Sequence, residues 1–547
     1  MKFIRLSIAL TTFVVLLHLS AKSQMSCDVT IPLTQSIVEG VSYQPGTVVC
    51  LAPGTRDYLL FKDLNGTAAQ PIVITSDGGL SKIDTDHYYG IKFSGCNHVL
   101  LSGAGTKASY GIKINRVGNG AGITIDNLSS DVEVEFVEIG HTLIGGIYAK
   151  TDPSCDNFSS TRDKFTMYNI IIHDCYLHDI GDEGFYIGSS KFTGQYLSSC
   201  DTTVLPHIIE GVEIYNNIVE NTGWDGIQVS STPLGCKIFG NTVRYDSQRE
   251  TTYQMSGILI GGGSVCDCYN NKVIDGKGDG IDVFGSNNMW IYNNLIVRAG
   301  RTFMPNDQSQ LKHGIFIGSA PDQSAASLKI LHNTIISPKT SGIRFMNNNT
   351  FDNKFINNII LDPGSYPTLA EKAFLDASID ISLYEYADNF LSTQISSALF
   401  VQAASDNYSL KPSSPAINKA QASAISFDID NAPRPHNQGA DIGAYECQDT
   451  YAGTGDLASG EVFELTLAPN PTSTSMVISL QHPVVASELK LVLLNVQGRI
   501  TDLSDRLTVG PESHQLTVNL LQIPVGVYLL ECVNGKRVSR GKVIISK

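Results

Sequence analysis

A short phrase of the form X-Gly-aliphatic-X-apolar recurs through the middle of this 547-residue chain. A second column, of asparagines in apolar frames, lies upstream of it. Two fixed columns at a short period mark a repeat in which each unit buries its face only against its neighbours, so the sequence predicts a solenoid. The glycines are Gly90, Gly111, Gly146, Gly184, Gly226, Gly257, Gly280, Gly314 and Gly342, and the asparagines are Asn217, Asn241, Asn271, Asn294, Asn333 and Asn358.

The spacing of the columns sets the size of one turn. Nine residues lead from Asn217 to Gly226 and again from Asn271 to Gly280. A turn of about 23 residues is too short for a strand and a helix with two loops, but it suits three short strands. The phrases alternate apolar and polar residues, which is strand periodicity, and stacked asparagines can hydrogen-bond from coil to coil.

Over residues 45–360 this pattern resembles the right-handed parallel β-helix of the pectate-lyase-like superfamily. The resemblance implies an all-β chain whose function lies wherever the repeat is broken. The composition agrees, since charged residues make up only 17% of the chain and glycine accounts for 49 residues. Such a composition is typical of a folded all-β protein and excludes a disordered chain.

The first residues are typical of an export signal. Lys2 and Arg5 precede an apolar run, and small residues follow at Ala21 and Ser23. We therefore assign residues 1–24 to a secretory signal peptide and expect an exported protein. The net charge of −15 makes nucleic acid an unlikely partner. We expect a monomer.

The cysteines fit export only in part, because their number, 11, is odd. Cys155 and Cys200 lie in polar inserts and are close enough in the pattern to be bridged. Cys236 and Cys266 each stand five residues before a ladder asparagine, so they should stack on adjacent coils. Coils about 4.8 Å apart allow either a disulfide or two stacked thiols at that position.

The C-terminal part of the chain changes character twice. Residues 362–450 lose both columns, and their end, around Arg434-Pro435 and Asp441 to Glu446, resembles the closing segment of exported bacterial β-helix proteins. The expected organisation is a β-helix with a C-terminal capping segment over 25–450, followed by a linker over 451–460. A cap protects the open edge and core of the last coil.

Residues 461–547 form a separate module. Its seven or so short strand patterns in fewer than 90 residues predict a small β-sandwich. The motifs Pro469-Asn470-Pro471 and Gly526-Val527-Tyr528, and the Lys-rich last strand, resemble the type A sorting domain of the type IX secretion system of the Bacteroidetes. The resemblance implies that the type IX secretion machinery is a partner and that the protein is secreted, to the medium or the cell surface.

Three insertions break the coil rule beside the same strand column. Loops on a rigid scaffold commonly carry binding sites, and three loops around one face predict a groove along it. The insertions lie between Asn241 and Gly257, between Asn294 and Gly314, and between Gly184 and Asn217.

The same face carries acids and aromatic residues. Acids stand directly before several of the glycines, and the residues two after the glycines point outward because the flanking aliphatic residues point inward. Paired carboxylates in a groove can act as acid and base on a glycosidic bond, and aromatic rings offer flat surfaces to sugars. The predicted catalytic residues are Glu183, Asp225, Asp279, Asp282 and His313, and the predicted substrate-binding residues are Tyr148, Tyr186, Trp224, Gln228, Phe316 and Arg344.

Three of these positions also resemble motifs of the polygalacturonases. In that family the acid matching Asp279 is catalytic, the histidine matching His313 assists, and the basic residue matching Arg344 holds a uronate. Lys277-Gly278 departs from the family's Asn-Thr, and an adjacent double-aspartate motif is absent from the sequence. We therefore predict a secreted carbohydrate-active protein acting on a polysaccharide, with a glycoside hydrolase as first choice.

Two alternatives remain open. A polysaccharide lyase needs a basic residue beside a uronate and often Ca²⁺, which the acid cluster has the oxygens to hold. The candidate bases are Lys150, Lys312, Arg298, Arg301 and Arg344. A non-catalytic glycan-binding or adhesin solenoid is the second alternative. Calcium is the one cofactor considered, and no metal ligands are assigned.

Overall fold

We describe the protein from a computed structural model. It covers residues 26–546 except 105, 107, 286–287, 304–310, 319–326, 348–349, 365–372, 378–383, 437, 449–464, 470–471, 481–488, 496–499, 504–506, 510–514, 524–525 and 535–536. The chain divides into two compact units, Met1–Thr450 and Tyr451–Lys547. The predicted signal peptide (1–24) and linker (451–460) lie outside the described residues.

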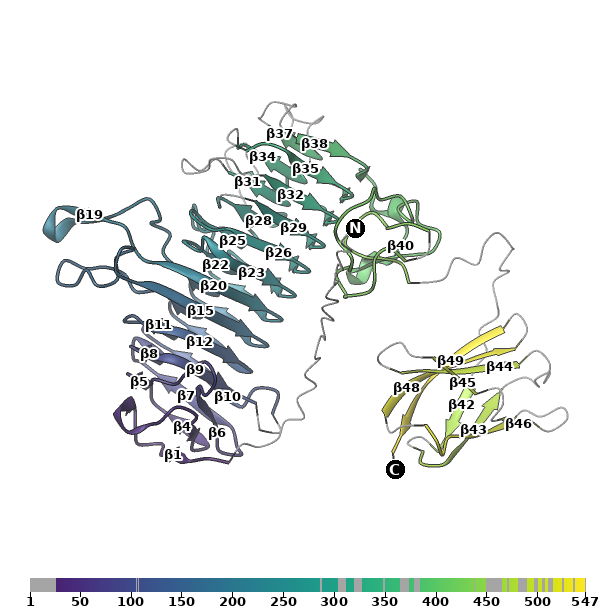
Figure 1. Ribbon diagram of the computed structural model, residues 1–547. Helices are drawn as coiled ribbons and strands as arrows, with labels where there is room; N and C mark the ends of the chain where they lie inside the picture. Colours follow the sequence, from purple (N-terminus) through teal and green to yellow (C-terminus); the bar gives the residue numbers. More distant parts are fainter. Residues whose placement is uncertain are drawn as a thin grey trace, which may run out of the picture. The chain divides into compact units, whose positions relative to one another are not determined.

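The first unit is the predicted parallel β-helix, built from three long sheets whose strands stack coil upon coil (Figure 1). Every strand pair within these sheets is parallel, and each coil gives one strand to each sheet in turn. The family resemblance and the strand periodicity are thus confirmed as a fold. The positions of the loops between strands decide where a site forms.

Sheet A holds thirteen of the described strands: β1 (Val29–Ile31), β3 (Val48–Leu51), β6 (Ile72–Ser76), β9 (Asn97–Ser102), β12 (Ser130–Glu135), β15 (Thr166–His173), β20 (Ile208–Tyr215), β23 (Leu234–Phe239), β26 (Cys266–Tyr269), β29 (Met289–Tyr292), β32 (Leu328–Leu331), β35 (Asn353–Ile356) and β38 (Tyr384–Ala387). Sheet B holds twelve: β2 (Ile37–Glu39), β5 (Leu59–Lys62), β8 (Tyr89–Ser94), β11 (Ala121–Asp126), β14 (Ile147–Ala149), β17 (Phe185–Ile187), β22 (Ile227–Val229), β25 (Ser256–Ile260), β28 (Asp279–Val283), β31 (Ile315–Ile317), β34 (Ile343–Phe345) and β37 (Leu375–Ala377).

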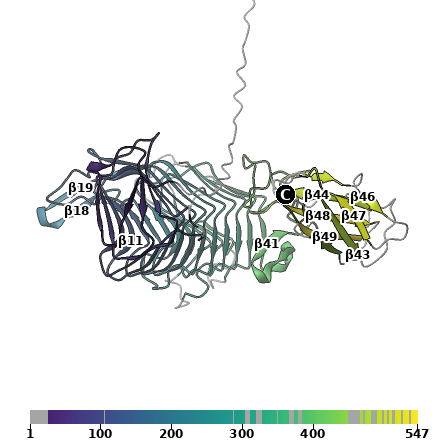
Figure 2. The same cartoon turned by 90° about the horizontal axis from the view of Figure 1, so that it is seen from below.

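Sheet C holds twelve more: β4 (Gly54–Arg56), β7 (Ser81–Thr85), β10 (Ile112–Val117), β13 (Val137–Thr142), β16 (Tyr176–Ile180), β21 (Ile218–Thr222), β24 (Thr242–Arg244), β27 (Lys272–Ile274), β30 (Leu295–Val297), β33 (Thr334–Ile336), β36 (Ile359–Leu361) and β39 (Phe390–Ser392). Two hairpins, β18 (Gln195–Leu197) with β19 (Thr202–Val204) and β40 (Phe400–Gln402) with β41 (Asn407–Leu410), lie outside the three sheets. The 3-10 helices described are η1 (Gly40–Ser42), η2 (Ser198–Cys200), η5 (Ile395–Ala398) and η6 (Ala403–Ser405). The β18–β19 hairpin projects away from the stacked strands (Figures 1 and 2).

Inward and outward positions alternate along sheet B. Ile227, Ile258 and Ile281 align in register and are fully buried in the core, as the strand pattern requires. The residues between them form a second aligned series on the opposite face, which we call the outward row. The outward row runs Tyr148, Tyr186, Gln228, Leu259, Asp282, Phe316 and Arg344.

One member of the glycine column is misassigned from the sequence. The phrase at Gly111 leads into β10, which belongs to sheet C. In sheet B the strand between β8 and β14 is β11, and Gly122 takes the glycine position there. Both strands have the same alternation of Gly, Ile and polar residues, so the phrase alone does not distinguish the sheets. Lys113 therefore lies on sheet C and pairs with Glu138, not on the face of Lys92.

The asparagine column is confirmed as an internal ladder. The side-chain Nδ2 of Asn271 donates to Asn294 Oδ1 at 3.0 Å and to the Ile238 carbonyl at 2.9 Å. Its Oδ1 accepts from both the backbone N–H and the Nδ2 of Asn241. The same pattern links each coil to the next along the series Asn217, Asn241, Asn271, Asn294, Asn333, Asn358 and Asn389.

The cysteines form three disulfides among the described residues. Cys155–Cys200 and Cys236–Cys266 join the pairs considered from the sequence, the second with Cα atoms 4.4 Å apart on adjacent coils. The third, Cys27–Cys50, was not foreseen, because Cys27 stands before the repeat begins. The remaining thiols include Cys268, which is buried beside the ladder and accepts a hydrogen bond from Asn271.

The segment predicted as a cap lies against the side of the solenoid. Residues 395–447, the flank segment, pack on the outer surface of sheet C, where Phe400 and Tyr408 share an apolar cluster with Leu295. Arg434 and Glu446 form an ion pair whose side chains are both fully buried. The flank segment therefore covers outward apolar residues of sheet C. The expected end cap would cover the last coil and did not include this contact with the side of the solenoid.

The second unit is a β-sandwich, as predicted. Met476, Leu493 and Leu516 contribute to a single apolar core that contains residues of both sheets. One sheet holds β42 (Leu465–Ala468), β43 (Ser475–Leu480), β47 (Gln515–Asn519) and β46 (Leu507–Val509), and the other holds β45 (Ile500–Asp502), β44 (Leu489–Asn495), β48 (Gly526–Asn534) and β49 (Arg537–Ile545).

The ladder yields a stability prediction. Asn271→Leu should lower the free energy of unfolding by about 1–3 kcal/mol, because it leaves buried donors and acceptors on both neighbouring coils unpaired. Denaturant unfolding measures the change. The adjacent Lys272→Leu, at a side chain 37% exposed, is the matched control and should change stability by less than about 0.5 kcal/mol. Equal stability of the Asn271→Leu protein and the wild type would contradict the structural role of the column.

Candidate functional site

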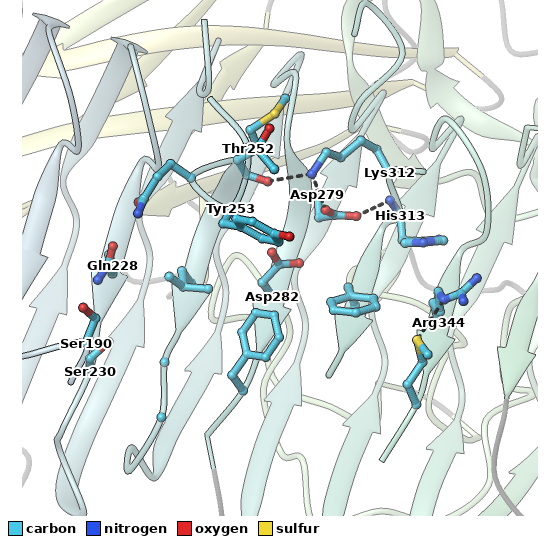
Figure 3. A pocket seen from close by; sticks show the side chains of 18 of the residues that line it. Ser190, Gln228, Ser230, Thr252, Tyr253, Asp279, Asp282, Lys312, His313 and Arg344 are labelled. Atoms are coloured by element: carbon cyan, nitrogen blue, oxygen red, sulfur yellow. Dashed lines mark hydrogen bonds and ion pairs between the residues drawn. The ribbon is translucent and has the colours of Figure 1, made fainter. Parts of the chain in front are cut away.

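The three insertions foreseen from the sequence surround a cavity of about 640 Å³ over sheet B. Ser190 comes from the insertion after β17, Tyr253 from the insertion between β24 and β25, and Lys312 from the insertion before β31. Figure 3 shows how the labelled side chains converge on this space. The described lining is Ser190, Gln228, Ser230, Thr252, Tyr253, Gln254, Met255, Leu259, Gly261, Gly262, Asp279, Asp282, Phe284, Leu311, Lys312, His313, Phe316, Arg344 and Met346.

The structure gathers some predicted site residues and separates others. Those that line the cavity are Asp279, Asp282, His313, Gln228, Phe316 and Arg344. Those outside its described lining are Glu183, Asp225, Tyr148, Tyr186 and Trp224. The second group belongs to the coils of β14, β17 and β22, N-terminal to most of the lining strands, and its roles stay predictions.

Asp282 occupies the outward row at the floor of the cavity. Its Oδ2 accepts a 2.6 Å hydrogen bond from the Ser256 hydroxyl, while Oδ1 is buried without a hydrogen-bond partner. Burial, followed by the negative charge of Asp279, raises the pKa of Asp282 well above its usual value. The raised pKa favours the protonated form of this side chain.

Asp279 stands at the start of the same strand in a different environment. Its Oδ2 forms an ion pair with Lys312 Nζ at 2.8 Å, and its Oδ1 accepts the backbone N–H of His313. Lys312 also donates to the Met255 carbonyl, which anchors it across the cavity (Figure 3). Two donors, one of them charged, hold this carboxyl group in place.

His313 is a buried neutral imidazole. Its Nδ1 lies 2.9 Å from Thr340 Oγ1, and that hydroxyl donates its proton to the Lys312 carbonyl at 2.6 Å. Since the hydroxyl has a single proton, His313 Nδ1 must be the donor, and Nε2 is left with a free lone pair. Burial lowers the pKa of His313 to about 4, so the ring stays neutral above that pH.

Arg344 ends the outward row within the cavity and is already paired. Its Nη1 lies 2.6 Å from Asp376 Oδ2 on the next strand, and its Nε contacts the sulfur of Met346. Asp376 is almost fully buried, so the pair is largely shielded from solvent. The guanidinium therefore shapes the cavity wall while its charge is balanced.

Tyr253 is an exposed aromatic residue over this site. Its side chain is 94% exposed although it lines the cavity, and its backbone has φ +67, a left-handed conformation that bulky residues rarely adopt. Figure 3 shows its ring beside Asp282. A strained backbone that presents an unpacked ring to a cavity suggests a role in binding.

Further acids lie buried behind the cavity. Asp225 is fully buried, and neither of its oxygens has a hydrogen-bond partner. Burial, then the charge of Glu183, raises its pKa well above the usual value. Burial also raises the pKa of Asp246 to about 6, although Ser247 donates to its Oδ1. Glu183 accepts from the Tyr148 hydroxyl at 2.7 Å, and burial raises its pKa too.

Sequence reasoning missed three members of this site. Ser256 stands in the column before the glycines, and its hydroxyl is a natural partner for the next coil's acid. Asp246 and Tyr253 belong to an insertion, where no coil spacing indicates the direction of a side chain. The insertion's presence was readable, but the conformation that aims Tyr253 at the cavity was not.

The acids of the cavity do not fit the calcium site considered above. Ca²⁺ takes six to eight oxygens, mainly from charged carboxylates and carbonyls. Asp279 is already paired with Lys312, and Asp282 has a raised pKa that favours its neutral form. Elsewhere in the described chain, ligand atoms of two groups come within 4.8 Å of one another, namely Glu133, Glu135 and His173, and His141, His178 and Asp179.

Two family models match the sequence. Residues 194–367 match the right-handed β-helix region, and residues 466–546 match the secretion system C-terminal sorting domain. The chain thus carries a β-helix region that includes most of the cavity lining and a type IX sorting domain that directs the protein to the cell surface or the medium. Among the described residues, no helix has the length and apolar character needed to cross a membrane. No curated protein matches the sequence.

Several solved structures superpose in part. An alginate lyase from Paenibacillus sp. str. FPU-7 is 17% identical, with 55% of this chain and 93% of that chain covered and a TM-score of 0.37. A pectate lyase is 13% identical, with 77% and 97% covered and a TM-score of 0.40. A GH136 lacto-N-biosidase from Eubacterium ramulus is 13% identical, with 64% and 63% covered and a TM-score of 0.38. Likenesses this distant carry no inference about activity.

The buried acids predict an unusual dependence of stability on pH. An unfolded aspartate ionises near pH 3.9, whereas Asp225 in the fold ionises only at higher pH. Between those two values the folded state holds more protons than the unfolded state, so stability falls as pH rises. Asp225→Asn should flatten this slope, which one such group makes as steep as about 1.4 kcal/mol per pH unit. Urea unfolding at pH 5, 6, 7 and 8 measures it.

Asp352→Asn is the matched control for this prediction. Asp352 is exposed, and Lys329 lowers the pKa of its carboxyl, so its contribution to stability has the opposite sign and is lost as pH falls. An unchanged slope in the Asp225→Asn protein would show that Asp225 is not a neutral buried acid.

Proposed function

We propose that the protein is a secreted glycoside hydrolase whose active site is the cavity over sheet B. The observation that carries this proposal is the difference between two carboxyl groups of one strand. Asp282 is buried with a raised pKa, while Asp279 is ion-paired with Lys312. A carboxyl group with a raised pKa near a second carboxyl group is what acid-assisted cleavage of a glycosidic bond requires.

Each group then has a definite role. Asp282 donates its proton to the glycosidic oxygen as the bond breaks, and the Ser256 hydroxyl holds its Oδ2 in place. Asp279 supplies the negative charge that stabilises the oxocarbenium-like transition state and accepts a proton from the attacking water. Lys312 fixes the position of Asp279 through a 2.8 Å ion pair.

The aromatic residues would bind the sugar. Tyr253 offers a free ring over the cavity, and Phe316 follows Asp282 in the outward row. Both would cover apolar faces of a sugar ring, and the polar Gln228 lies two coils before Asp282. Export through the sorting domain is consistent with a polymeric substrate outside the cell.

A lyase is the weaker reading of the same cavity. Elimination needs a base near neutral pH beside a uronate, but Lys312 is paired with Asp279, whose charge favours the protonated amine. The other candidate bases are engaged elsewhere: Arg298 with Asp275 and Asp406, Arg301 with Asp362, and Lys150 with Asp152.

The roles of the two acids are directly testable. Asp282→Asn and Asp279→Asn should each lower kcat at least about a hundredfold on a polysaccharide that the wild type cleaves, because each removes acid–base assistance while preserving shape. Release of reducing ends measures the rate, and circular dichroism checks folding. Asp267→Asn, at a partly buried carboxyl on sheet A, is the matched control. Full activity of both variants would overturn the proposal, as would an unsaturated product absorbing in the ultraviolet.

The pH profile offers an independent check. Activity should decline as pH rises through the raised pKa of Asp282, because the general acid must hold its proton. The Ser256 hydrogen bond stabilises the ionised form and lowers that pKa. Ser256→Ala should therefore move the alkaline limb of kcat/KM to higher pH. A shift to lower pH would contradict the role of Asp282 as acid.

Tyr253 should act on binding rather than on chemistry. Tyr253→Ala should raise KM about two- to tenfold with kcat nearly unchanged, because a stacking contact is worth about 0.5–1.5 kcal/mol. Tyr253→Phe should restore the wild-type KM. Tyr88→Ala, at a ring 75% exposed on a distant coil, is the control and should leave KM unchanged. An unchanged KM in the Tyr253→Ala protein would remove this ring from the site.

A further inference from the structure

We infer that the cavity accepts a neutral sugar residue and excludes a uronate, an inference that rests on the proposed function and deepens it. The polygalacturonase-like motifs favour an anionic substrate, held by Arg344. The contacts around the cavity point to the opposite charge preference.

Both full cations of the described lining already have an anionic partner. Lys312 Nζ lies 2.8 Å from Asp279, and Arg344 Nη1 lies 2.6 Å from Asp376. The side chains of Asp279 and Asp376 are only 8% and 3% exposed, so these ion pairs are largely desolvated. A uronate would have to displace a buried carboxylate that stays behind unpaired, which is costly.

The other titratable groups of the lining add no positive charge. Burial lowers the pKa of His313 to about 4, so this side chain carries no positive charge near neutral pH. Asp282 is a carboxyl group that is 7% exposed, and it offers a uronate no positive charge. The undescribed stretches nearest in sequence, 304–310 and 319–326, contain no lysine, arginine or histidine.

Apolar side chains also line the cavity close to the ion pairs. Leu259 takes the outward position between Gln228 and Asp282, and Met255 and Leu311 come from the insertions beside it. Aliphatic side chains pack against the C–H faces of a sugar and gain nothing from a carboxylate. The net charge of −15 further repels an anionic polymer as it approaches.

Together these contacts define the substrate class as a neutral glycan. The conclusion also separates the two chemistries, because a neutral sugar lacks the carboxylate that acidifies the adjacent C–H for elimination. Hydrolysis by Asp282 and Asp279 requires no such group.

The test measures binding apart from turnover. The full-length Asp282→Asn protein is run in affinity electrophoresis through neutral polymers (galactan, arabinan, xylan, mannan and mixed-linkage β-glucan) and through alginate and demethylated pectin. Retention by at least one neutral polymer, at least about tenfold stronger than by either uronate polymer, is expected. Stronger or equal retention by a uronate polymer, or retention by none of the neutral ones, overturns the inference.

A pair of variants that each remove one negative charge tests the cause. In the same background, Asp376→Asn leaves Arg344 without its partner and should increase retention by demethylated pectin at least about threefold. Glu385→Gln removes an equal charge from the Lys354 pair on sheet A and should have no such effect. Equal effects of the two variants would show that net charge, not the balanced arginine, excludes the uronate.

The outcomes also separate this inference from the proposed function. Binding of a neutral polymer without release of reducing ends by the wild type would refute the hydrolase and leave the neutral cavity standing. Release of reducing ends from uronate polymers alone would support a hydrolase and refute the neutral cavity.

Discussion

The hydrogen bonds that join each coil to the next hold every other feature of this protein in place. Parallel strand pairing and the asparagine ladder together fix the register, so that position for position the coils superpose. Only because of that register do Asp282 and Phe316, which are far apart in the chain, become neighbours. A slip of one residue in any strand would send its outward side chain into the core. The ladder is therefore a condition for the site as well as for stability.

Much of this was readable in the sequence, since the period of the columns reports directly on the register. Alternation located the outward face, and broken spacing located the insertions that wall the cavity. The sequence-based predictions differ from the structure where one sequence pattern is compatible with two structural positions. Gly111 and Gly122 both head Ile-rich strands, and nothing local says which belongs to sheet B. The sequence motifs of the flank segment indicate where the β-helix ends, which led to the expectation of an end cap. They do not indicate that the segment packs on the outer surface of sheet C.

The sequence predicts which column of the repeat carries the site residues, but not which members of that column line the cavity. Asp225 and Asp279 occupy equivalent positions before a glycine, yet Asp225 is sealed behind the cavity while Asp279 lines it. The loop between β24 and β25 hydrogen-bonds to residues 222–224, directly before Asp225, through the backbone N–H groups of Ser247, Gln248 and Arg249. Loop conformation depends on contacts that no short-range spacing encodes, and Tyr253, with its left-handed backbone, is the clearest instance.

The buried carboxyl groups show how such a scaffold carries a destabilising site. Unpaired oxygens on Asp225, Asp246 and Asp282 cost folding free energy that an apolar core would not. The solenoid tolerates them because each coil is held on both sides by its neighbours, and the apolar inward row continues without interruption beneath the acids. The same separation frees the outward row to vary. A change at Leu259 alters the cavity floor without touching Ile258 or Ile260, so the recognition of a sugar can change one coil at a time while the core and its ladder stay intact.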